Sequence, residues 1–349
     1  MNKTYDASVY IGRFQPFLNA HLSQLRQALA LAPLCMVVIA GAHRATSPRH
    51  PFTGEQRAAM ILAALSPQER SRVRIICLRD DYDTLRWSAQ VQAQLAAFAP
   101  EAGAVALLQE PNSHLPSLPW AHISPEKAPS ASSSAWRERM YAAPDAGAEL
   151  ASGHALLAPG TEGLLADWLS GPDFKTAAAN WEALQQMRAE WAGSPYTPIF
   201  VTVDAVVHCA GQILLIQRGR APGEGLLALP GGFIEADETV TQSAIRELIE
   251  ETGLDVPLPE LHAALREIRV FDDPWRSQRG RVLTHGHYFD LGERKLPAIC
   301  AGDDAANAFW VPRQALPDLE ARFHDDHYQI LDYFLHLIGP GDTACACAQ

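Results

Sequence analysis

Three glutamates in the C-terminal half of the chain have a spacing suited to metal-dependent chemistry. On a helix at 100° per residue, Glu247, Glu250 and Glu251 fall within about 100° of arc, and the apolar residues among them cluster on the opposite side. Carboxylates this close repel one another by about 0.2–0.5 kcal/mol per pair on an exposed helix. A hard divalent cation converts that repulsion into binding and carries substrate phosphates beside it. The spacing therefore indicates a site for a hard divalent cation such as Mg²⁺, the alternative being an acidic, solvated helix face.

The glutamates belong to a longer pattern, GFIEADETVTQSAIRELIEETGL, which spans residues 232–254. Gly232 is followed by five residues and Glu238, and then by seven residues and Arg246. Gly253 is placed to end the helix in the left-handed conformation. The segment resembles the Nudix box, Gly-x5-Glu-x7-Arg-Glu-apolar-x-Glu-Glu-x-Gly-apolar, and every fixed position of that pattern is filled.

The Nudix resemblance implies a hydrolase that cleaves nucleoside diphosphates linked to another group and that depends on Mg²⁺ or Mn²⁺. The three glutamates then hold the metals, and the turn residue Gly232 joins this metal set. Arg246 is counted with the catalytic residues, and its family counterpart pairs with the counterpart of Glu238 to brace the loop–helix–loop. Bound metals would polarise the diphosphate and lower the pKa of an attacking water. Either Glu250 or an acid from a loop would serve as the general base.

A basic segment downstream, VFDDPWRSQRGRVLTHGHYFDL, carries Arg276, Arg279 and Arg281. Guanidinium groups match phosphate oxygens, so these residues and Arg218 are candidates for substrate binding, the alternative being a solvated basic turn. The segment resembles Phe-Asp-x-Pro-x-Arg-Ser-x-Arg-Gly-Arg-x-x-Thr-His of Nudix domains fused to nicotinamide mononucleotide (NMN) adenylyltransferases. That resemblance favours ADP-ribose as the substrate, and Trp275 is a candidate either for stacking on adenine or for simple packing.

Several histidines and acids in this half favour structural interpretations. His285 and His287 lie two apart on an expected strand, hence on one face. The string HDDH at 324–327 lies in an amphipathic helical segment, FHDDHYQILDYFLHLI, where histidines are more often packed than metal-bound. The acids at 303–304 are candidates either for an extra acid near the metals or for a loop cap.

A second constellation opens the chain, where residues 11–21 read IGRFQPFLNAH. Gly12 and Arg13 form a loop after a strand, and the loop leads into a helix near His21. Backbone N–H groups and the dipole at a helix N-terminus favour anions, and the two side chains add donors. These residues indicate a phosphate site, the alternative being a structural turn.

The N-terminal string resembles the Gly-Arg-Phe-Gln-Pro-Phe-His-x-Gly-His signature of the nucleotidylyltransferase superfamily, specifically of the NMN adenylyltransferases. The resemblance implies that Trp87 lies near the nicotinamide. It also implies that Ser132, Ser134 and Arg137, which match a Ser-x-Thr-x-x-Arg loop, bind the phosphates of ATP. NMN and ATP are accordingly the substrates expected of this domain.

The adenylyltransferase signature has departures. Leu18 replaces its first histidine, Ala20 replaces its glycine, and QEPNSHLP at 109–116 replaces a Gly-x-x-x-Asp segment. Adenylyl transfer relies on positioning ATP and stabilising charge at the α-phosphate, so one lost donor typically costs about 10²–10³ in rate. We therefore expect an adenylyltransferase fold with weak or no activity. The alternatives are a truly bifunctional enzyme of NAD metabolism and an N-terminal domain that senses nicotinamide nucleotides and regulates the other.

The elements that must position these sites form an α/β protein. A strand at 7–11, a helix at 21–31 and a strand at 35–41 make a βαβ unit, which predicts a parallel, Rossmann-like sheet. Residues 109–135 read as loop and residues 160–192 as helical, and SPYTP at 194–198 marks the domain boundary. We expect a nucleotidylyltransferase-like domain at 1–192, a Nudix domain at 196–340, and a flexible tail at 341–349. The resemblance implies that the Nudix domain is an α/β/α sandwich with a mixed sheet.

Composition limits the partners. The 349 residues are 48% hydrophobic, and 28 basic residues against 40 acidic ones give a net charge of −12, which argues against nonspecific binding to nucleic acid or to anionic membranes. The six cysteines are scattered without zinc-site spacing, and neither a membrane-length apolar run nor a signal-peptide core is present. We expect a cytoplasmic protein with reduced cysteines that acts on small nucleotides, with a homo-oligomer as one possible assembly.

Overall fold

The computed structural model of the protein describes residues 5–109, 118–124, 132–338 and 344–345. It divides into two compact units, residues 1–178 with 339–349 and residues 179–338, so the division falls inside helix α8 (Pro172–Glu190) rather than at 194–198. The contacts of the two ends of α8 explain this position. Phe174 stacks on Tyr141 within the first unit, whereas Asn180 Oδ1 accepts a hydrogen bond from the backbone N–H of Gly223 in the second.

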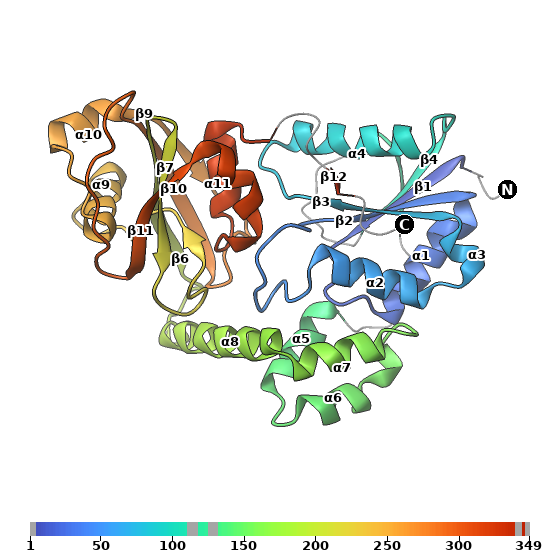
Figure 1. The fold of residues 1–349 in the computed structure, drawn as a ribbon. Coiled ribbons are helices and arrows are strands. Elements are labelled where there is room, and N and C mark those ends of the chain that lie inside the picture. Colours follow the sequence, from blue (N-terminus) through green and yellow to red (C-terminus); the bar gives the residue numbers. More distant parts are fainter. Residues whose placement is uncertain (1–4, 110–117, 125–131, 339–343, 346–349) are drawn as a thin grey trace. The chain divides into compact units, whose positions relative to one another are not determined.

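The first unit is built on a sheet with the strand order β12–β3–β2–β1–β4–β5 (Figure 1). All neighbouring pairs run parallel except β12 with β3. The predicted Rossmann-like sheet is therefore confirmed. The strands are β1 (Ala7–Gly12), β2 (Leu34–Ile39), β3 (Val73–Leu78), β4 (Val105–Gln109), β5 (Ala121–Ile123) and β12 (Ala344–Cys345).

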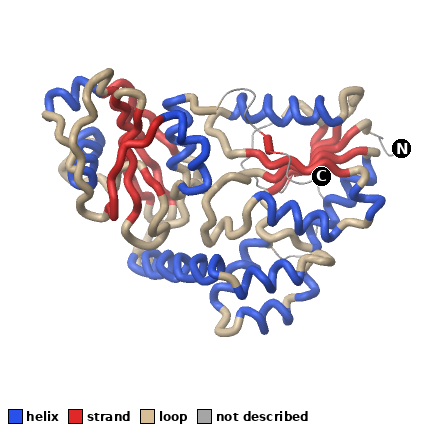
Figure 2. The backbone as a smooth tube through the Cα atoms, in the orientation of Figure 1, coloured by secondary structure: helices blue, strands red, loops and turns tan. Residues whose placement is uncertain are grey.

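Helices cover both faces of this sheet (Figure 2). Trp87, Val91 and Leu95 of α4 pack into one core with the strands, and α1 and α2 lie against the other face. The helices are α1 (Asn19–Leu31), α2 (Gly54–Ala64), α3 (Pro67–Arg70), α4 (Thr84–Phe98), α5 (Ser133–Ala142), α6 (Ala146–Ser152), η1 (His154–Leu156) and α7 (Glu162–Ser170). Strand β5 and the start of α5 lie inside the stretch that reads as loop from the sequence, so that expectation is wrong at these positions.

The C-terminal tail lies mostly outside the described residues. Its described pair, β12, runs antiparallel to the end of β3 opposite Leu78 and Cys77. Cys77 is disulfide-bonded, which contradicts the expectation of reduced thiols at this position. Three cysteines among the described residues are free, namely Cys35, Cys209 and Cys300.

The second unit contains a sheet in the order β11–β7–β6–β10–β9, with β8 beside β7 (Figure 1). Strands β6 and β10 are parallel and the other pairs are antiparallel, so the sheet is mixed, as the Nudix resemblance implies. The strands are β6 (Ile199–Cys209), β7 (Gln212–Arg218), β8 (Leu227–Ala228), β9 (Leu265–Phe271), β10 (Arg281–Asp290) and β11 (Ala305–Pro312).

Helices sandwich this mixed sheet. On one face, α9 (Val240–Thr252) and α10 (Leu258–Ala264) bury Leu248 and Leu261 against strand residues that include Phe289. On the other face, Phe334 of α11 (His327–Leu335) packs on Phe271 and Tyr288, and η2 (Arg313–Arg322) precedes that helix. The apolar stripe of α9 is thus fixed on the sheet, which leaves its acidic side for chemistry. Over the ranges described, no helix combines the length and apolar character needed to cross a bilayer.

Candidate functional site

The candidate site in the second unit is built on helix α9 and on the turn that precedes it. The Thr239 side chain caps α9 by accepting from the backbone N–H of Gln242, and the Gln242 amide oxygen accepts in return from the backbone N–H of Thr239 at 2.9 Å. The helix ends at Gly253, whose φ of 51° is left-handed as predicted. Helix α9 therefore has fixed ends, which hold its glutamates in register.

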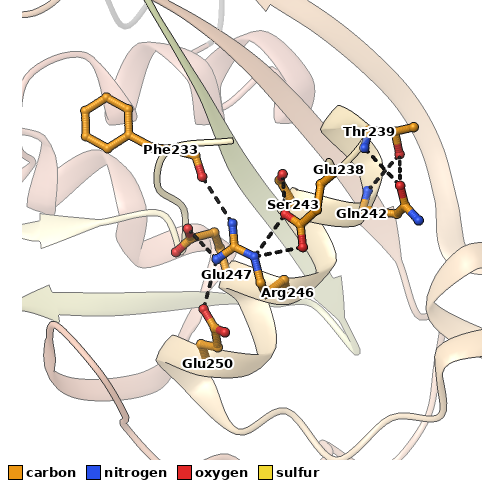
Figure 3. Close-up of polar contacts among 8 residues, drawn as sticks. All are labelled: Phe233, Glu238, Thr239, Gln242, Ser243, Arg246, Glu247 and Glu250. Carbon is orange, nitrogen blue, oxygen red and sulfur yellow. Dashed lines mark hydrogen bonds and ion pairs between the residues drawn. The ribbon is translucent and has the colours of Figure 1, made fainter. Parts of the chain in front are cut away.

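Arg246 is the centre of the polar contacts around the helix (Figure 3). Its Nε donates to both carboxylate oxygens of Glu238 at 3.0 Å, which is the brace that the Nudix resemblance implies. Its Nη1 donates to Glu247 at 2.8 Å and to Glu250 at 3.0 Å, and its Nη2 donates to the backbone carbonyl of Phe233 at 3.1 Å. One guanidinium thus ties the turn after Gly232 to two of the three predicted metal ligands.

The third glutamate faces the protein interior. Glu251 is 6% exposed and accepts a hydrogen bond from the backbone N–H of Gly231 at 2.8 Å. Burial raises the pKa of Glu251 to about 8, although the hydrogen bond from Gly231 opposes this shift. The negative charge of nearby Glu247 raises the pKa further. Burial also raises the pKa of Glu247, although Arg246 opposes the shift. These carboxylates are held in positions where added positive charge would stabilise their ionised forms.

The residues at this site fit a hard divalent cation. A Cβ at Gly232 would lie 2.5 Å from the Glu247 carboxylate, so only glycine leaves that carboxylate room beside the turn. The carboxylates of Glu247, Glu250 and Glu251 and the backbone carbonyl of Gly232 are oxygen donors, which is the type of ligand that Mg²⁺ and Mn²⁺ prefer. As the side chains stand, the described parts of the chain contain no group of three or more His, Cys, Asp or Glu residues that could hold a metal ion. Arg246 engages Glu247 and Glu250, and Glu251 accepts from Gly231.

The four predicted substrate arginines have different environments. Arg276 is only 5% exposed and donates to both carboxylate oxygens of Asp326, at 2.9 and 2.8 Å, so its guanidinium is engaged inside the protein. Arg281 donates to the backbone carbonyl of Asp272 at 2.6 Å. Burial lowers the pKa of Arg218, and the positive charge of Arg279 lowers it further. Arg218 and Arg279 therefore lie close enough for their positive charges to repel each other.

A buried polar network supports this side of the site, and sequence reasoning missed it. Asp204 on β6 accepts a hydrogen bond from Thr284 Oγ1 at 2.6 Å, and one of its carboxylate oxygens lies 3.8 Å from Arg276 Nη2. Asp326 is fully buried beneath the same guanidinium. The available signal was a single carboxylate within the apolar run IFVTVDAVV, because buried acids require partners.

The histidines at 324 and 327 are packed, in agreement with their structural interpretation. His327 Nδ1 accepts from the backbone N–H of Leu229 at 3.0 Å, and His324 is 6% exposed against the glycine turn at 223. Asp304 forms an ion pair with Arg220 at 2.8 Å. In the β10 pair, His287 is fully buried.

His324 is expected to make stability depend on pH. Burial, with the charges of Arg218 and other neighbours, lowers its pKa from 6.5 to about 3, although Asp325 opposes the shift. Between these values this histidine binds more protons in the unfolded chain than in the folded chain, so its effect on the free energy of unfolding is absent above pH 6.5 and lowers stability toward pH 3, by about 1.4 kcal/mol for each pH unit. His324→Gln should flatten the dependence of the unfolding free energy on pH between 6.5 and 4, measured by urea titration. The same change at the exposed His262 is the control, and equal slopes for His324→Gln and the unmodified protein would contradict the expectation.

The N-terminal constellation lies in the first unit, at the carboxyl ends of its strands. Arg13 and Arg44 donate to Asp80 at 2.9 and 2.6 Å, and these arginines keep the pKa of Asp80 below its ordinary value despite burial. Arg57 donates to the carbonyls of Arg13, Ala40 and Gly41, and burial lowers its pKa to about 9. The structure therefore brings two arginines onto one carboxylate, and Arg57 holds the backbone beside them.

His21 and Leu18 mark the start of α1. The ring of His21 is 8% exposed and lies between Phe14 and Phe17, with centroid distances of 5.4 and 5.6 Å. Its Nδ1 accepts from the backbone N–H of Leu18 at 2.9 Å, and the Leu18 side chain is 1% exposed. A neutral ring that accepts at Nδ1 carries its proton on Nε2. A Cβ at Gly12 would lie 2.5 Å from the ring of Phe14, so this position requires glycine.

The other predicted nucleotide-binding residues occupy separate places. Trp87 is 1% exposed within the α4 core, and its indole donates to the carbonyl of Arg79 at 3.1 Å. Ser132 caps α5 by accepting from the backbone N–H of Ala135, and Ser134 is exposed in the first turn of that helix. Arg137 is 8% exposed and donates to the carbonyl of Gln15. Arg137 thus lies against the Gly12–His21 loop, whereas Trp87 is buried beneath α4.

Comparisons with known proteins identify both units. Residues 198–334 match the NUDIX domain family and residues 9–102 match the Cytidylyltransferase-like family. A solved structure from Francisella tularensis, a bifunctional NMN adenylyltransferase/ADP ribose pyrophosphatase complexed with AMP and a manganese ion, is 31% identical to the chain with a TM-score of 0.88. That match covers 96% of this chain and 100% of the Francisella chain.

Two curated relatives match separate parts of the chain. An ADP-ribose pyrophosphatase of Methanocaldococcus jannaschii is 39% identical over 136 residues, covering 38% of this chain and 72% of that protein. A nicotinamide/nicotinic acid mononucleotide adenylyltransferase of Acinetobacter baylyi is 32% identical over 104 residues, covering 30% of this chain and 55% of that protein. With the full-length match to the Francisella structure, these identities show that the chain belongs to the family of bifunctional NMN adenylyltransferase/ADP ribose pyrophosphatases, with a Nudix hydrolase as its C-terminal domain.

Proposed function

We propose that the protein hydrolyses ADP-ribose to AMP and ribose 5-phosphate with Mg²⁺ or Mn²⁺, as part of NAD metabolism. The observation that carries this proposal is the carboxylate set of α9, in which Arg246 holds Glu247 and Glu250 beside the Gly232 turn. The Francisella relative, which contains AMP and manganese, supports both the product and the class of metal.

The reaction requires one water and no covalent intermediate on the protein. The oxygen of water forms a bond to one phosphorus, the bridging P–O bond breaks with its electron pair going to the departing phosphate, and one proton of the water passes to a base, so that AMP and ribose 5-phosphate are released. A divalent cation, when bound by Glu247, Glu250 and Glu251, supplies polarisation of the diphosphate and a lowered pKa for the water. In this proposal Arg218 receives phosphate oxygens and Arg279 contacts another part of the substrate, whereas Arg276, held by Asp326, positions the segment that carries Arg279.

The N-terminal domain is, in this proposal, an NMN adenylyltransferase-like domain with weak or no activity. Arg13, Arg137 and His21 offer donors near one loop, and this favours retained nucleotide binding. Leu18 puts a buried apolar side chain at the first turn of α1, where the family signature has a histidine. We therefore expect Leu18 in place of histidine to lower the rate of adenylyl transfer and to leave the fold intact.

Chelation and a substrate screen test the hydrolase assignment. ADP-ribose hydrolysis by the full-length protein should fall to background with excess EDTA and return on addition of Mg²⁺ or Mn²⁺, because carboxylates alone cannot activate water in this way. Release of phosphate after coupling to a phosphatase compares ADP-ribose with NADH, diadenosine polyphosphates and nucleoside triphosphates. A clear preference for one of the other substrates, or full activity in EDTA, would contradict the proposal.

A further inference from the structure

An exposed aromatic ring follows the catalytic turn directly. Phe233 is 44% exposed, although it adjoins Gly232 in the turn before α9. Its backbone carbonyl accepts from Arg246 Nη2 at 3.1 Å, and it forms an isolated antiparallel bridge with Thr202 on β6. The guanidinium that holds Glu247 and Glu250 therefore also fixes the backbone that carries this ring. In Figure 3 the ring projects away from those carboxylates.

Two side chains complete a small surface around that ring. The guanidinium carbon of Arg279 lies 5.4 Å from the centroid of the Phe233 ring. The ring of Phe200 meets Phe233 edge-on, with centroids 5.8 Å apart and an interplanar angle of 70°. The buried Arg279 Nε has no hydrogen-bond partner among the described residues. We call Phe233, Phe200 and Arg279 the Phe233 platform.

Core packing does not account for the platform. Phe200 meets Phe233 edge-on, and nearly half of the Phe233 side chain remains exposed to water. Aromatic rings and arginine planes are the groups on which nucleobases stack, since every base has a π face and a guanidinium adds a cation. A purine also offers ring nitrogens as acceptors to the guanidinium N–H groups. The exposed aromatic face of the platform, with a guanidinium beside it, therefore matches a base.

We propose that Phe233 stacks on the base of the nucleotide whose diphosphate lies at the α9 carboxylates, with Arg279 beside that base. The proposal rests on the proposed hydrolase function and adds a residue that selects substrates with an aromatic base at one end. It also distinguishes Phe233 from Trp275, the other candidate for stacking. Trp275 is 55% exposed on the turn between β9 and β10, at a position that Arg246 does not fix directly.

Kinetics with and without a base on the substrate test this role. The full-length protein is assayed with ADP-ribose and with a diphosphate that joins two ribose 5-phosphate groups and so lacks the base. Phe233→Ala should raise KM for ADP-ribose about 10- to 100-fold, with kcat and hydrolysis of the base-free compound changed less than about twofold. Phe233→Trp should restore KM, and Trp275→Ala, the matched control, should leave it near the original value.

Binding of the products separates this proposal from the hydrolase assignment. Calorimetric titration with AMP and with ribose 5-phosphate needs no turnover, so it reports stacking even if ADP-ribose is not the preferred substrate. Phe233→Ala should weaken AMP binding at one site about 10- to 100-fold and leave ribose 5-phosphate binding unchanged. Equal losses for substrates with and without a base would show that Phe233 acts through the metal turn. A loss in Trp275→Ala with none in Phe233→Ala would assign the base to Trp275, and either result overturns the proposal.

Discussion

Replacing Glu250 or Glu251 with glutamine should lower kcat/KM for ADP-ribose by about 10²- to 10³-fold while leaving the fold intact. Each substitution keeps the shape of the side chain and removes one negative charge from the set that would hold a cation. Loss of one electrostatic contact made in the transition state typically costs this much in rate. At Glu251 the amide oxygen of glutamine still accepts from the backbone N–H of Gly231, so the turn should keep its hydrogen bond.

The control for this prediction lies in the same motif. Glu235 is exposed between Gly232 and Glu238, outside the fixed positions of the Nudix pattern, so Glu235→Gln should retain near-normal activity. Hydrolysis is measured over a range of Mg²⁺ concentrations, and thermal unfolding checks that each variant is folded. If Glu250→Gln and Glu251→Gln both cleave ADP-ribose as fast as the unmodified protein, the metal-site assignment is wrong.

Local periodicity was sufficient to predict the elements around the hydrolase site. The 3.6-residue spacing that separates Leu248 from the glutamates predicts α9, and the left-handed conformation at Gly253 follows from the absence of a side chain. The N-terminal βαβ unit likewise follows from short apolar strands around one helix. These features depend on residues close together in the sequence, which is why the sequence alone predicts them.

Features decided by distant residues escaped prediction. The sequence around Arg276 predicts a phosphate ligand. Its guanidinium is instead buried and bound by Asp326, which lies fifty positions away in the sequence. By contrast, Val91 and Leu95 follow Trp87 at four-residue spacing, which is the pattern of the face that α4 buries. The apolar character of Phe233 predicts burial, whereas its position beside the metal turn leaves it exposed. Where a distant residue such as Asp326 engages a side chain, the sequence around that side chain does not show whether it is available for chemistry.

The double substitution Leu18→His with Ala20→Gly should increase NAD formation from NMN and ATP about 10²- to 10³-fold over a low starting rate. Leu18 caps α1 with its backbone while its side chain supplies no donor, so charge that develops on the α-phosphate lacks one contact there. His21 keeps its Nε2 proton because Nδ1 already accepts from the Leu18 backbone, and Arg137 remains against the same loop. The imidazole restored at position 18 would then donate to the α-phosphate beside His21 and Arg137, which are still in place.

The apolar substitution Leu18→Met is the matched control, because it changes shape without adding a donor and should leave the rate low. NAD formation is followed in the full-length protein with Mg²⁺, and ADP-ribose hydrolysis, which should not change, shows that each variant is folded. A polar ring at a site only 1% exposed must be solvated by substrate or by a neighbour, so some loss of stability should accompany the gain in rate. If the unmodified protein and the double variant form NAD at the same high rate, Leu18 does not limit the reaction and the N-terminal domain is an active adenylyltransferase; if both stay at the low rate, the presence of Leu18 and Ala20 is not what limits it.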